Sequence, residues 1–171
     1  METSHHKNIY YCCITLNGIN IYIYTSSEEL LYISLKTPKE NSDKFRLTKV
    51  KEDDPYMLDV PKQLKEYFEG KRKKFSVKMD LSGTPFQLKV WKELTKIPYG
   101  KTISYKDLAK KTGDVKAVRA VGTANGHNPI PIIIPCHRVI NSNGELGGYS
   151  GGLDIKVILL TLEGVLEPSL L

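Results

Sequence analysis

The sequence has few cysteines and lacks any long hydrophobic run. Three cysteines in 171 residues are an odd number and too few for a disulfide scaffold, which fits a reducing compartment. The most apolar stretch, Ile130–Pro135, is far shorter than the roughly 20 residues that a membrane-spanning helix needs. The first residues also lack the basic and then apolar pattern of a secretion signal. These absences predict a soluble cytoplasmic protein with no membrane contact.

An acidic excess is absent too. The chain has 25 Lys and Arg against 19 Asp and Glu, a net charge of +6. This balance excludes an acidic, self-repelling chain and allows an anionic partner. Residues 86–138 hold ten basic and three acidic residues, whereas residues 139–171 hold one and four. A solvated lysine-rich surface and a nucleic-acid-binding segment both fit this distribution, so the motifs of the segment must decide.

Residues 1–83 predict a small N-terminal α/β domain with an antiparallel sheet, followed by a linker. The first predicted strand is rich in Tyr, Ile and Cys, and isoleucines alternate with Asn and Tyr along the second, with the tight-turn pair Asn17-Gly18 between the two strands. A short helix follows with a proline in its first turn and Gly70 as its terminator. The expected elements are strands 9–16, 19–24 and 30–35, a polar loop 37–57, a helix 61–69 and a linker 70–83.

Residues 84–171 predict a second, mostly helical domain. Thr84 and Gln87 form a capping-box pattern around Pro85, the first helical position. Two short helices then flank the glycine turn at Gly113, which predicts a helix-turn-helix. The expected helices are 84–97, 104–111, 114–125 and one from 155 that stops before Gly164. The whole chain is therefore expected to be of the α/β (α+β) class.

The helix expected over 114–125 has an unusual composition. It combines small residues such as Ala120 and Gly122 with the basic residue Arg119. Small residues allow close approach to another surface, which can be the core of the domain itself. They equally suit a helix that lies against a DNA backbone, with Arg119 as its one long probe. Composition alone leaves both interpretations open.

A Cys-His pair follows a stiff, proline-rich segment. Prolines 129, 131 and 135 restrict the backbone before Cys136 and His137. A nearby imidazole can accept a thiol proton and so create a thiolate nucleophile. Adjacent residues of a strand point apart, so contact between the two side chains needs a turn or a bridging water. A buried structural cysteine is the commoner outcome for such a dipeptide.

Glu163 lies in the last turn of the final predicted helix, where a carboxylate opposes the helix dipole. Residues that break such a local rule tend to lie at functional positions. A glutamate that orients His137 would complete a Cys-His-Glu relay. An exposed, functionless glutamate is the simpler alternative, because the sequence alone does not bring residues 137 and 163 together.

Four linked motifs resemble the active-site signature of the O6-alkylguanine-DNA alkyltransferases. They lie in the family's order and spacing within residues 84–167, about half of the chain, and residues 1–70 resemble the family only in general plan. The motifs are Tyr99–Lys106, Arg119–Gly122, Ile134–Val139 and Gly147–Leu153.

The resemblance implies a suicide DNA-repair protein that acts as a monomer without metal or cofactor. Such a protein binds double-stranded DNA containing alkylated bases from the minor groove, through a winged-helix-like helix-turn-helix. It rotates the damaged nucleotide out of the stack and moves the O6 alkyl group irreversibly onto its own cysteine. Whether O4-alkylthymine is also a substrate stays open.

The resemblance also implies roles for individual residues. Cys136 is the alkyl acceptor, His137 a general base acting through a water, and Glu163 the residue that holds the imidazole. Asn128 is a hinge between the recognition helix and the active-site loop, and Tyr105 aids nucleotide rotation and protonates the base. The implied DNA contacts are Arg119, Tyr105, Lys106, Ala120, Gly122 and Ser142. The implied alkylguanine pocket is Pro135, Val139, Tyr149 and Ser150.

Zinc is one point of departure from some family members. Cys12 and Cys13 are adjacent in a predicted strand, and His5 and His6 lie near the terminus. This is not a zinc-ligand spacing, so we expect no metal, with one of the two cysteines facing inward and one outward.

Three other functions compete with repair. A lesion-binding module without transfer activity is one, although relatives of that kind lack the acceptor cysteine. A transcription regulator that uses the same helix-turn-helix is another. A cysteine hydrolase is the third, and it would turn over repeatedly rather than once.

Overall fold

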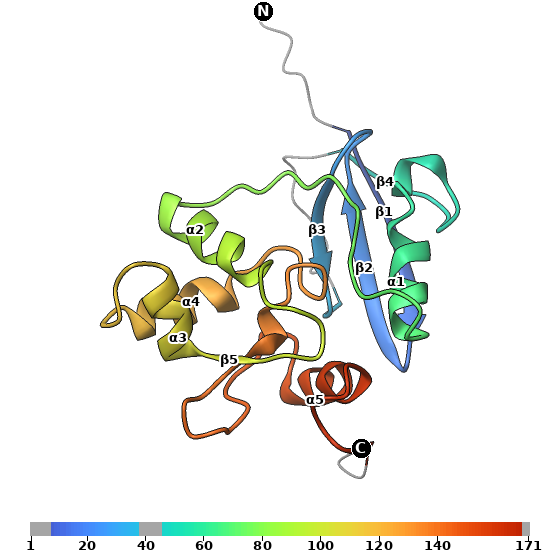
Figure 1. Ribbon diagram of the computed structural model, residues 1–171. Helices are drawn as coiled ribbons and strands as arrows, with labels where there is room; N and C mark the ends of the chain where they lie inside the picture. Colours follow the sequence, from blue (N-terminus) through green and yellow to red (C-terminus); the bar gives the residue numbers. More distant parts are fainter. Residues whose placement is uncertain (1–7, 38–45, 169–171) are drawn as a thin grey trace, which may run out of the picture. The chain divides into compact units, whose positions relative to one another are not determined.

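The computed structural model describes residues 8–37 and 46–168, and for Arg46 the backbone only. The chain divides into two compact units, residues 1–80 and 81–171. Figure 1 shows a sheet with a helix packed on it in the first unit and a group of short helices in the second. This is the mixed α/β class expected from the sequence. The predicted absence of metal at His5 and His6 lies outside the described residues.

The first unit is built on a four-stranded sheet with the order β3-β2-β1-β4. Strand β1 (Asn8–Leu16) pairs antiparallel with β2 (Ile19–Thr25), which pairs antiparallel with β3 (Leu30–Ser34). The turn between the first two strands places both Asn17 and Gly18 at positive φ, the geometry of a type I′ hairpin turn. The hairpin predicted from this dipeptide is therefore confirmed.

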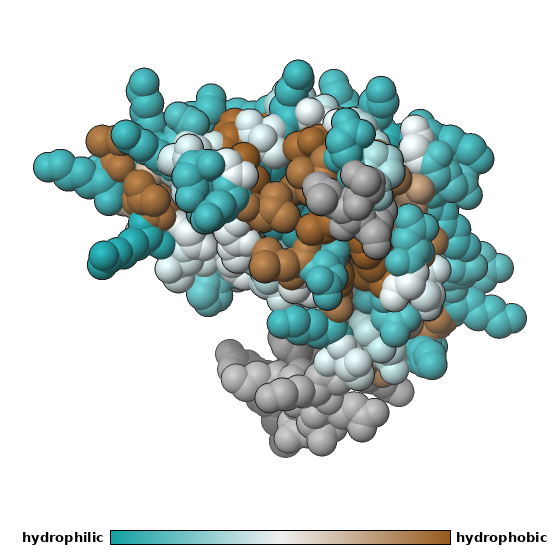
Figure 2. Space-filling view, turned by 90° about the horizontal axis from the view of Figure 1, so that it is seen from below, coloured by the Kyte–Doolittle hydropathy of each residue, from teal (hydrophilic) through white to brown (hydrophobic). Residues whose placement is uncertain are grey.

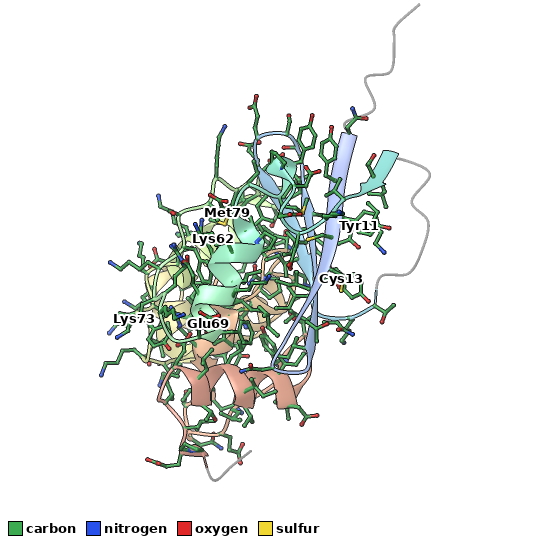
Figure 3. All side chains as sticks on the ribbon, turned by 90° about the vertical axis from the view of Figure 1, so that its right-hand side faces the viewer. Tyr11, Cys13, Lys62, Glu69, Lys73 and Met79 are labelled. Atoms are coloured by element: carbon green, nitrogen blue, oxygen red, sulfur yellow. The ribbon has the colours of Figure 1, made fainter. Side chains whose placement is uncertain are left out.

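Helix α1 (Val60–Phe68) covers one face of this sheet. Its apolar side chains pack with the inward-facing residues of the strands, and the core of the unit includes Ile21, Ile23, Ile33, Leu64 and Tyr67. On β1, Cys12 is buried and Cys13 is exposed, as the sequence predicted. Figure 3 shows Tyr11 and Cys13 on the side of the sheet away from α1.

Three expectations for this unit need correction. The polar stretch 37–57 is not one long loop, because it includes strand β4 (Arg46–Lys49) and the 3₁₀ helix η1 (Pro55–Met57). Strand β4 pairs parallel with β1, so the sheet is mixed rather than purely antiparallel. Part of the expected linker is also fixed, since the backbone around Met79 bonds to Leu30 of β3. Backbone partners distant in sequence hold these segments in place.

In the second unit, side-chain caps open two of the helices as predicted. Thr84 and Gln87 make both bonds of a capping box at the start of α2 (Pro85–Leu94). Ser104 and Asp107 do the same for α3 (Tyr105–Lys111). Strand β5 (Ile103–Ser104) leads into α3 and pairs parallel with β6 (Val139–Ile140). The two capping boxes determine where the helices begin.

The core of the second unit lies between α2, α3 and α4 (Val118–Gly126). Trp91 and Leu94 of α2 are buried, and the Trp91 indole donates to the Ala124 carbonyl over 2.9 Å. Two predicted boundaries were wrong. Helix α2 ends at Leu94 rather than near Ile97, and Asp114 caps a turn that precedes α4 instead of starting the helix.

The last helix, α5 (Leu153–Leu162), stops before Gly164 as predicted, but Glu163 is its C-cap residue and does not lie within its last turn. None of the helices in the described ranges is long and apolar enough to cross a membrane. Some large apolar side chains remain exposed, among them Leu153 and Val115. Figure 2 shows one face, on which apolar residues lie among hydrophilic ones.

Candidate active site

Cys136 lies in a short 3₁₀ turn, η2 (Cys136–Arg138), at the end of the proline-rich segment. Cys136 and His137 therefore lie in a turn and not in an extended strand. Just before it, Ile132 has φ of +74°, a costly conformation for a β-branched residue. Both Cys136 and Ile132 are fully or almost fully buried. The thiol is therefore presented from a stiff and strained segment.

Asn128 joins the end of α4 to the cysteine. Its amide nitrogen donates to the Cys136 Sγ over 3.0 Å and to the Ile134 carbonyl over 2.7 Å. Its Oδ1 accepts from the Ile130 amide over 3.0 Å. A donor aimed at the sulfur favours the thiolate over the thiol. Asn128 thus both holds the segment and favours the charged form of the Cys136 sulfur.

His137 and Glu163 are brought together. The His137 Nε2 lies 2.9 Å from a Glu163 carboxylate oxygen, and both side chains are buried. Since a carboxylate only accepts, Nε2 carries the proton of the neutral ring. The other nitrogen, Nδ1, is buried and has no hydrogen-bond partner. An imidazole held in this tautomer has a free lone pair that can accept a thiol proton.

Arg138 shares the same carboxylate. Its Nε and Nη2 donate to Glu163 over 2.9 Å and 2.8 Å, and its Nη1 donates to the Ile97 carbonyl over 2.6 Å. The Gly100 amide completes the set at 3.1 Å. Glu163 is thus neither exposed nor dedicated to His137 alone. It balances a buried guanidinium and orients an imidazole at the same time.

Burial governs the acid–base state of the two reacting groups. Burial raises the pKa of the Cys136 thiol, and the Asn128 amide, the Tyr149 side chain and the Lys156 charge oppose that rise. Burial also lowers the pKa of His137, against the effect of Glu163. Both shifts favour the neutral forms. The resting site is therefore a thiol beside a neutral imidazole.

A cavity of about 250 Å³ lies between α3, α4 and the segment that precedes α5. Its walls include Tyr105, Gly122, Asn125, Gly148, Tyr149 and Ser150. The Tyr105 hydroxyl donates to the Gly148 carbonyl over 3.4 Å, and burial raises its pKa, as does the nearby Cys136 charge. Gly122 lies beside the Tyr105 ring, whose carbons would be in ordinary van der Waals contact with an added Cβ, at 3.9 Å.

Lys156 holds the backbone of Gly148, one of the residues that line this cavity. Its side chain is fully buried in α5, and its ammonium donates to the carbonyls of Val139, Leu146 and Gly148. Burial lowers its pKa to about 8, so it stays mostly protonated at neutral pH. One buried cation therefore ties β6 to the backbone next to Tyr149.

The structure sorts the residues predicted from the sequence into three groups. Cys136, His137, Asn128 and Glu163 form the buried cluster described above, with Pro135 and Val139 buried beside it in the chain. Tyr105, Tyr149, Ser150 and Gly122 line the cavity. The side chains of the third group are exposed outside it: Lys106, Arg119, Ala120 and Ser142.

Sequence reasoning missed Arg138, Lys156 and Asn125 as site residues. Lys156 was detectable in principle, because it is the only basic residue of a largely apolar helix. Arg138 and Asn125 gave no such signal, since their burial depends on tertiary packing. Among the described residues, no group of three or more His, Cys, Asp and Glu could hold a metal ion.

The fold and the site define a class of protein. It has a helix-turn-helix in the same unit as a buried thiol, and the residue after that thiol is a buried histidine hydrogen-bonded to a buried carboxylate. Comparison with known proteins gives the family. Residues 85–165 match the DNA binding domain of 6-O-methylguanine DNA methyltransferase, and residues 20–81 match its ribonuclease-like domain. The chain belongs to the 6-O-methylguanine DNA methyltransferase family, as the motifs predicted.

Individual relatives agree over most of the chain. The inducible methylated-DNA–protein-cysteine methyltransferase of Bacillus subtilis is 41% identical over 169 residues, covering 95% of this chain and 94% of that protein. The Methanosarcina acetivorans methylated-DNA–protein-cysteine methyltransferase is 53% identical over 113 residues, 66% of this chain and 72% of that protein.

Solved structures have the same fold. The Mycobacterium tuberculosis O6-methylguanine methyltransferase aligns with a TM-score of 0.82 and 38% identity, over 94% of this chain and 96% of that one. A Mycobacterium tuberculosis structure determined in complex with DNA aligns with a TM-score of 0.82 and 40% identity, over 91% of this chain and 93% of that one.

Proposed function

We propose that this protein repairs DNA by moving the alkyl group of O6-alkylguanine irreversibly onto Cys136. The observation that carries the proposal is the buried thiol, 3.0 Å from the Asn128 amide and next in sequence to a histidine oriented by Glu163. The names of the relatives, methylated-DNA–protein-cysteine methyltransferases, describe the same reaction. The DNA-bound relative supports DNA as the partner.

The helix-turn-helix formed by α3 and α4 is the proposed DNA-binding surface. Residues 86–138 hold the chain's basic excess, as contact with phosphates requires. Ala120 is exposed on α4, so a phosphate backbone can approach the helix closely there. The exposed side chain of Arg119 is long enough to fill the gap left by a flipped nucleotide. Lys106 and Ser142 add exposed contacts to the backbone.

The flipped base enters the cavity between Tyr105 and Tyr149. His137 Nδ1 then takes the proton of the Cys136 thiol through a bridging water, and Glu163 and the Asn128 amide stabilise the resulting charges. The thiolate forms a bond to the alkyl carbon as the bond from that carbon to O6 breaks. The electron pair of the broken bond passes to the purine, and a proton from the Tyr105 hydroxyl neutralises the charge on the ring. The proton that left the Cys136 thiol then returns from His137 through water to the Tyr105 oxygen.

The product explains why the protein acts once. A thioether has no proton to lose and no good leaving group, so the cysteine is not regenerated. One chain therefore repairs one lesion, and a monomer suffices. The chemistry uses only side chains of this chain, and we propose that it needs no metal or diffusible cofactor.

Mass spectrometry after incubation with an O6-methylguanine duplex tests the proposal. We expect one added methyl group, on the peptide that contains Cys136, and a burst of one methyl per protein molecule. Cys136→Ala should retain DNA binding and gain no methyl, whereas Cys13→Ala, at an exposed cysteine, should react like the unmodified sequence. Repeated turnover, or methyl transfer by Cys136→Ala, would refute the proposal.

A further inference from the structure

The face of the sheet that lies away from α1 carries a row of tyrosines. Tyr11 of β1 is in register with Tyr24 of β2, and Tyr24 is in register with Tyr32 of β3. The ring centroids are 5.6 Å apart for Tyr11 and Tyr24 and 6.0 Å apart for Tyr24 and Tyr32. Figure 3 shows Tyr11 on this side of the sheet. Adjacent strands thus supply three neighbouring rings, which we call the tyrosine row.

The tyrosine row is accessible to solvent. Tyr32 is 47% exposed, and Tyr11 and Tyr24 are half-buried. Cys13 and Tyr22, which pair with each other on the same face, extend the accessible surface along β1 and β2. The outer face of a sheet that is packed on one side only is ordinarily polar. A cluster of large rings on such a face therefore marks an interaction site.

The charges around the tyrosine row fit an anionic partner. Lys49 of β4 is exposed and in register with Tyr11, so a lysine stands at the end of the row. Alternation along the strands places no Asp or Glu among the described side chains of this face. Leu47 is the only large aliphatic side chain of the described strands that is exposed, so a protein partner would bury little aliphatic surface here.

Nucleic acid is the anion whose chemistry matches this surface. Its bases are flat rings that stack on aromatic side chains, and its phosphates attract lysine. In a duplex the faces of the bases are covered by neighbouring base pairs, whereas in a single strand they are free to stack on a protein. Four-stranded sheets that present two or three aromatic rings on one face commonly bind single strands in this way.

We propose that the tyrosine row is a stacking platform for single-stranded nucleic acid, with Lys49 as a phosphate contact. The platform lies in residues 1–80, whereas the helix-turn-helix proposed to bind duplex DNA lies in residues 81–171. It therefore adds a second binding surface to the proposed repair function and does not depend on that function. Binding to the platform requires neither base pairing nor an alkylated base.

Fluorescence anisotropy tests the platform with a labelled oligothymidylate of about 12 nucleotides, a strand that does not pair with itself. Every titration contains a saturating lesion-free duplex without adenine runs, which occupies the helix-turn-helix. We expect saturable binding, which the double variant Tyr24→Val and Tyr32→Val weakens about fivefold or more, because stacking on one base contributes at least that factor. Valine keeps the strand propensity of tyrosine. No binding beside the duplex, or an unchanged affinity in the double variant, would overturn the proposal.

Salt dependence tests the phosphate contact. For single strands, each neutralised phosphate contributes about 0.7 to the slope of log affinity against log salt concentration. Lys49→Gln should therefore reduce that slope by about 0.7, and an unchanged slope would contradict the contact at Lys49. An oligouridylate of the same length, titrated in parallel, distinguishes DNA from RNA as the tighter ligand, and binding of either supports the platform.

Matched variants separate stacking from other effects. Tyr32→Phe keeps the ring and should bind as the original sequence does. Tyr56→Val removes an exposed tyrosine that stacks on Tyr10, a residue on the other face of β1, and should also leave the affinity unchanged. Methyl transfer from an O6-methylguanine duplex to Cys136 should be the same in all these variants, which shows that each is folded. If the double variant is inactive, Tyr32→Val alone carries the test.

Two further outcomes are distinguishable. A dimer that sedimentation detects and Tyr32→Val dissociates, without binding of the oligonucleotide, would identify a second copy of the chain as the occupant and overturn the proposal. Failure of methyl transfer in the original sequence would refute the repair function. The oligonucleotide titrations would still decide on the platform, with folding of the variants then checked by circular dichroism.

Discussion

Replacing Glu163 by glutamine should separate the stabilising role of the carboxylate from its chemical one. The carboxylate accepts four hydrogen bonds within 3.1 Å, two from Arg138, one from His137 and one from the Gly100 amide. Glutamine keeps the shape but removes the charge that balances the Arg138 guanidinium, which is 6% exposed. Removing one partner of a buried ion pair typically costs about 3–5 kcal/mol.

That loss is large against the total stability of a small protein, about 5–15 kcal/mol. With a urea m-value of about 2 kcal/mol per molar, it moves the unfolding midpoint down by about 1.5–2.5 M. Urea titration followed by circular dichroism and Trp91 fluorescence measures the shift. Glu93→Gln is the matched control, because Glu93 pairs with the exposed Lys96 and such surface pairs contribute under about 1 kcal/mol.

A double variant distinguishes charge balance from packing. Arg138→Met with Glu163→Gln removes both buried charges, so it should be more stable than Glu163→Gln alone. Methyl transfer should be slow in both the single and the double variant, because His137 Nε2 lacks its carboxylate partner in each. A midpoint shift in Glu163→Gln no larger than that in Glu93→Gln, or full transfer by the double variant, would contradict these roles of Glu163.

Two further variants test the thiol and the cavity. Asn128→Leu removes the hydrogen-bond donor to the Cys136 Sγ and should raise the pKa of the thiol further. Methyl transfer should then be roughly tenfold slower at pH 7, and less so at high pH, where the thiolate forms anyway. An unchanged pH–rate profile would argue against this role of Asn128. Gly147→Ala places a Cβ 3.2 Å from the Tyr105 ring and should slow methyl transfer. Gly144 also has a positive φ, but a Cβ added there meets no atom within 4 Å, so Gly144→Ala is the control. Equal transfer rates in these two variants would rule out a steric effect on Tyr105.

Much of the fold was predictable because its signals are local. Asn17-Gly18 determines the first hairpin, and the capping boxes at Thr84 and Ser104 determine where two helices begin. Strand β4 was not predictable, because it is a short polar segment ordered by parallel pairing with the distant β1. The fourth strand and the anchoring of Met79 both depend on non-local backbone partners, which no window of sequence contains.

The site was predictable only to the extent that a family resemblance supplied it. Without that resemblance, Cys136 could equally be a structural thiol and Glu163 an exposed carboxylate with no function. The structure brings His137 within 2.9 Å of Glu163, a contact between residues 26 positions apart. It also places Arg138 and Lys156 in the interior, where each is held by acceptors from several segments. Burial of a charge is a property of the packed chain, so composition does not reveal it.

The acid–base state of the resting site follows from this burial. Burial raises the pKa of Cys136 and lowers that of His137, so the pair rests as thiol and imidazole rather than as thiolate and imidazolium. A thiol is a far weaker nucleophile than a thiolate and resists oxidation better. For a protein that can use its cysteine once, this state protects the thiol until a base occupies the cavity. The groups that stabilise the ionised pair, Asn128 and Glu163, are already in position, so proton transfer requires no rearrangement of their side chains.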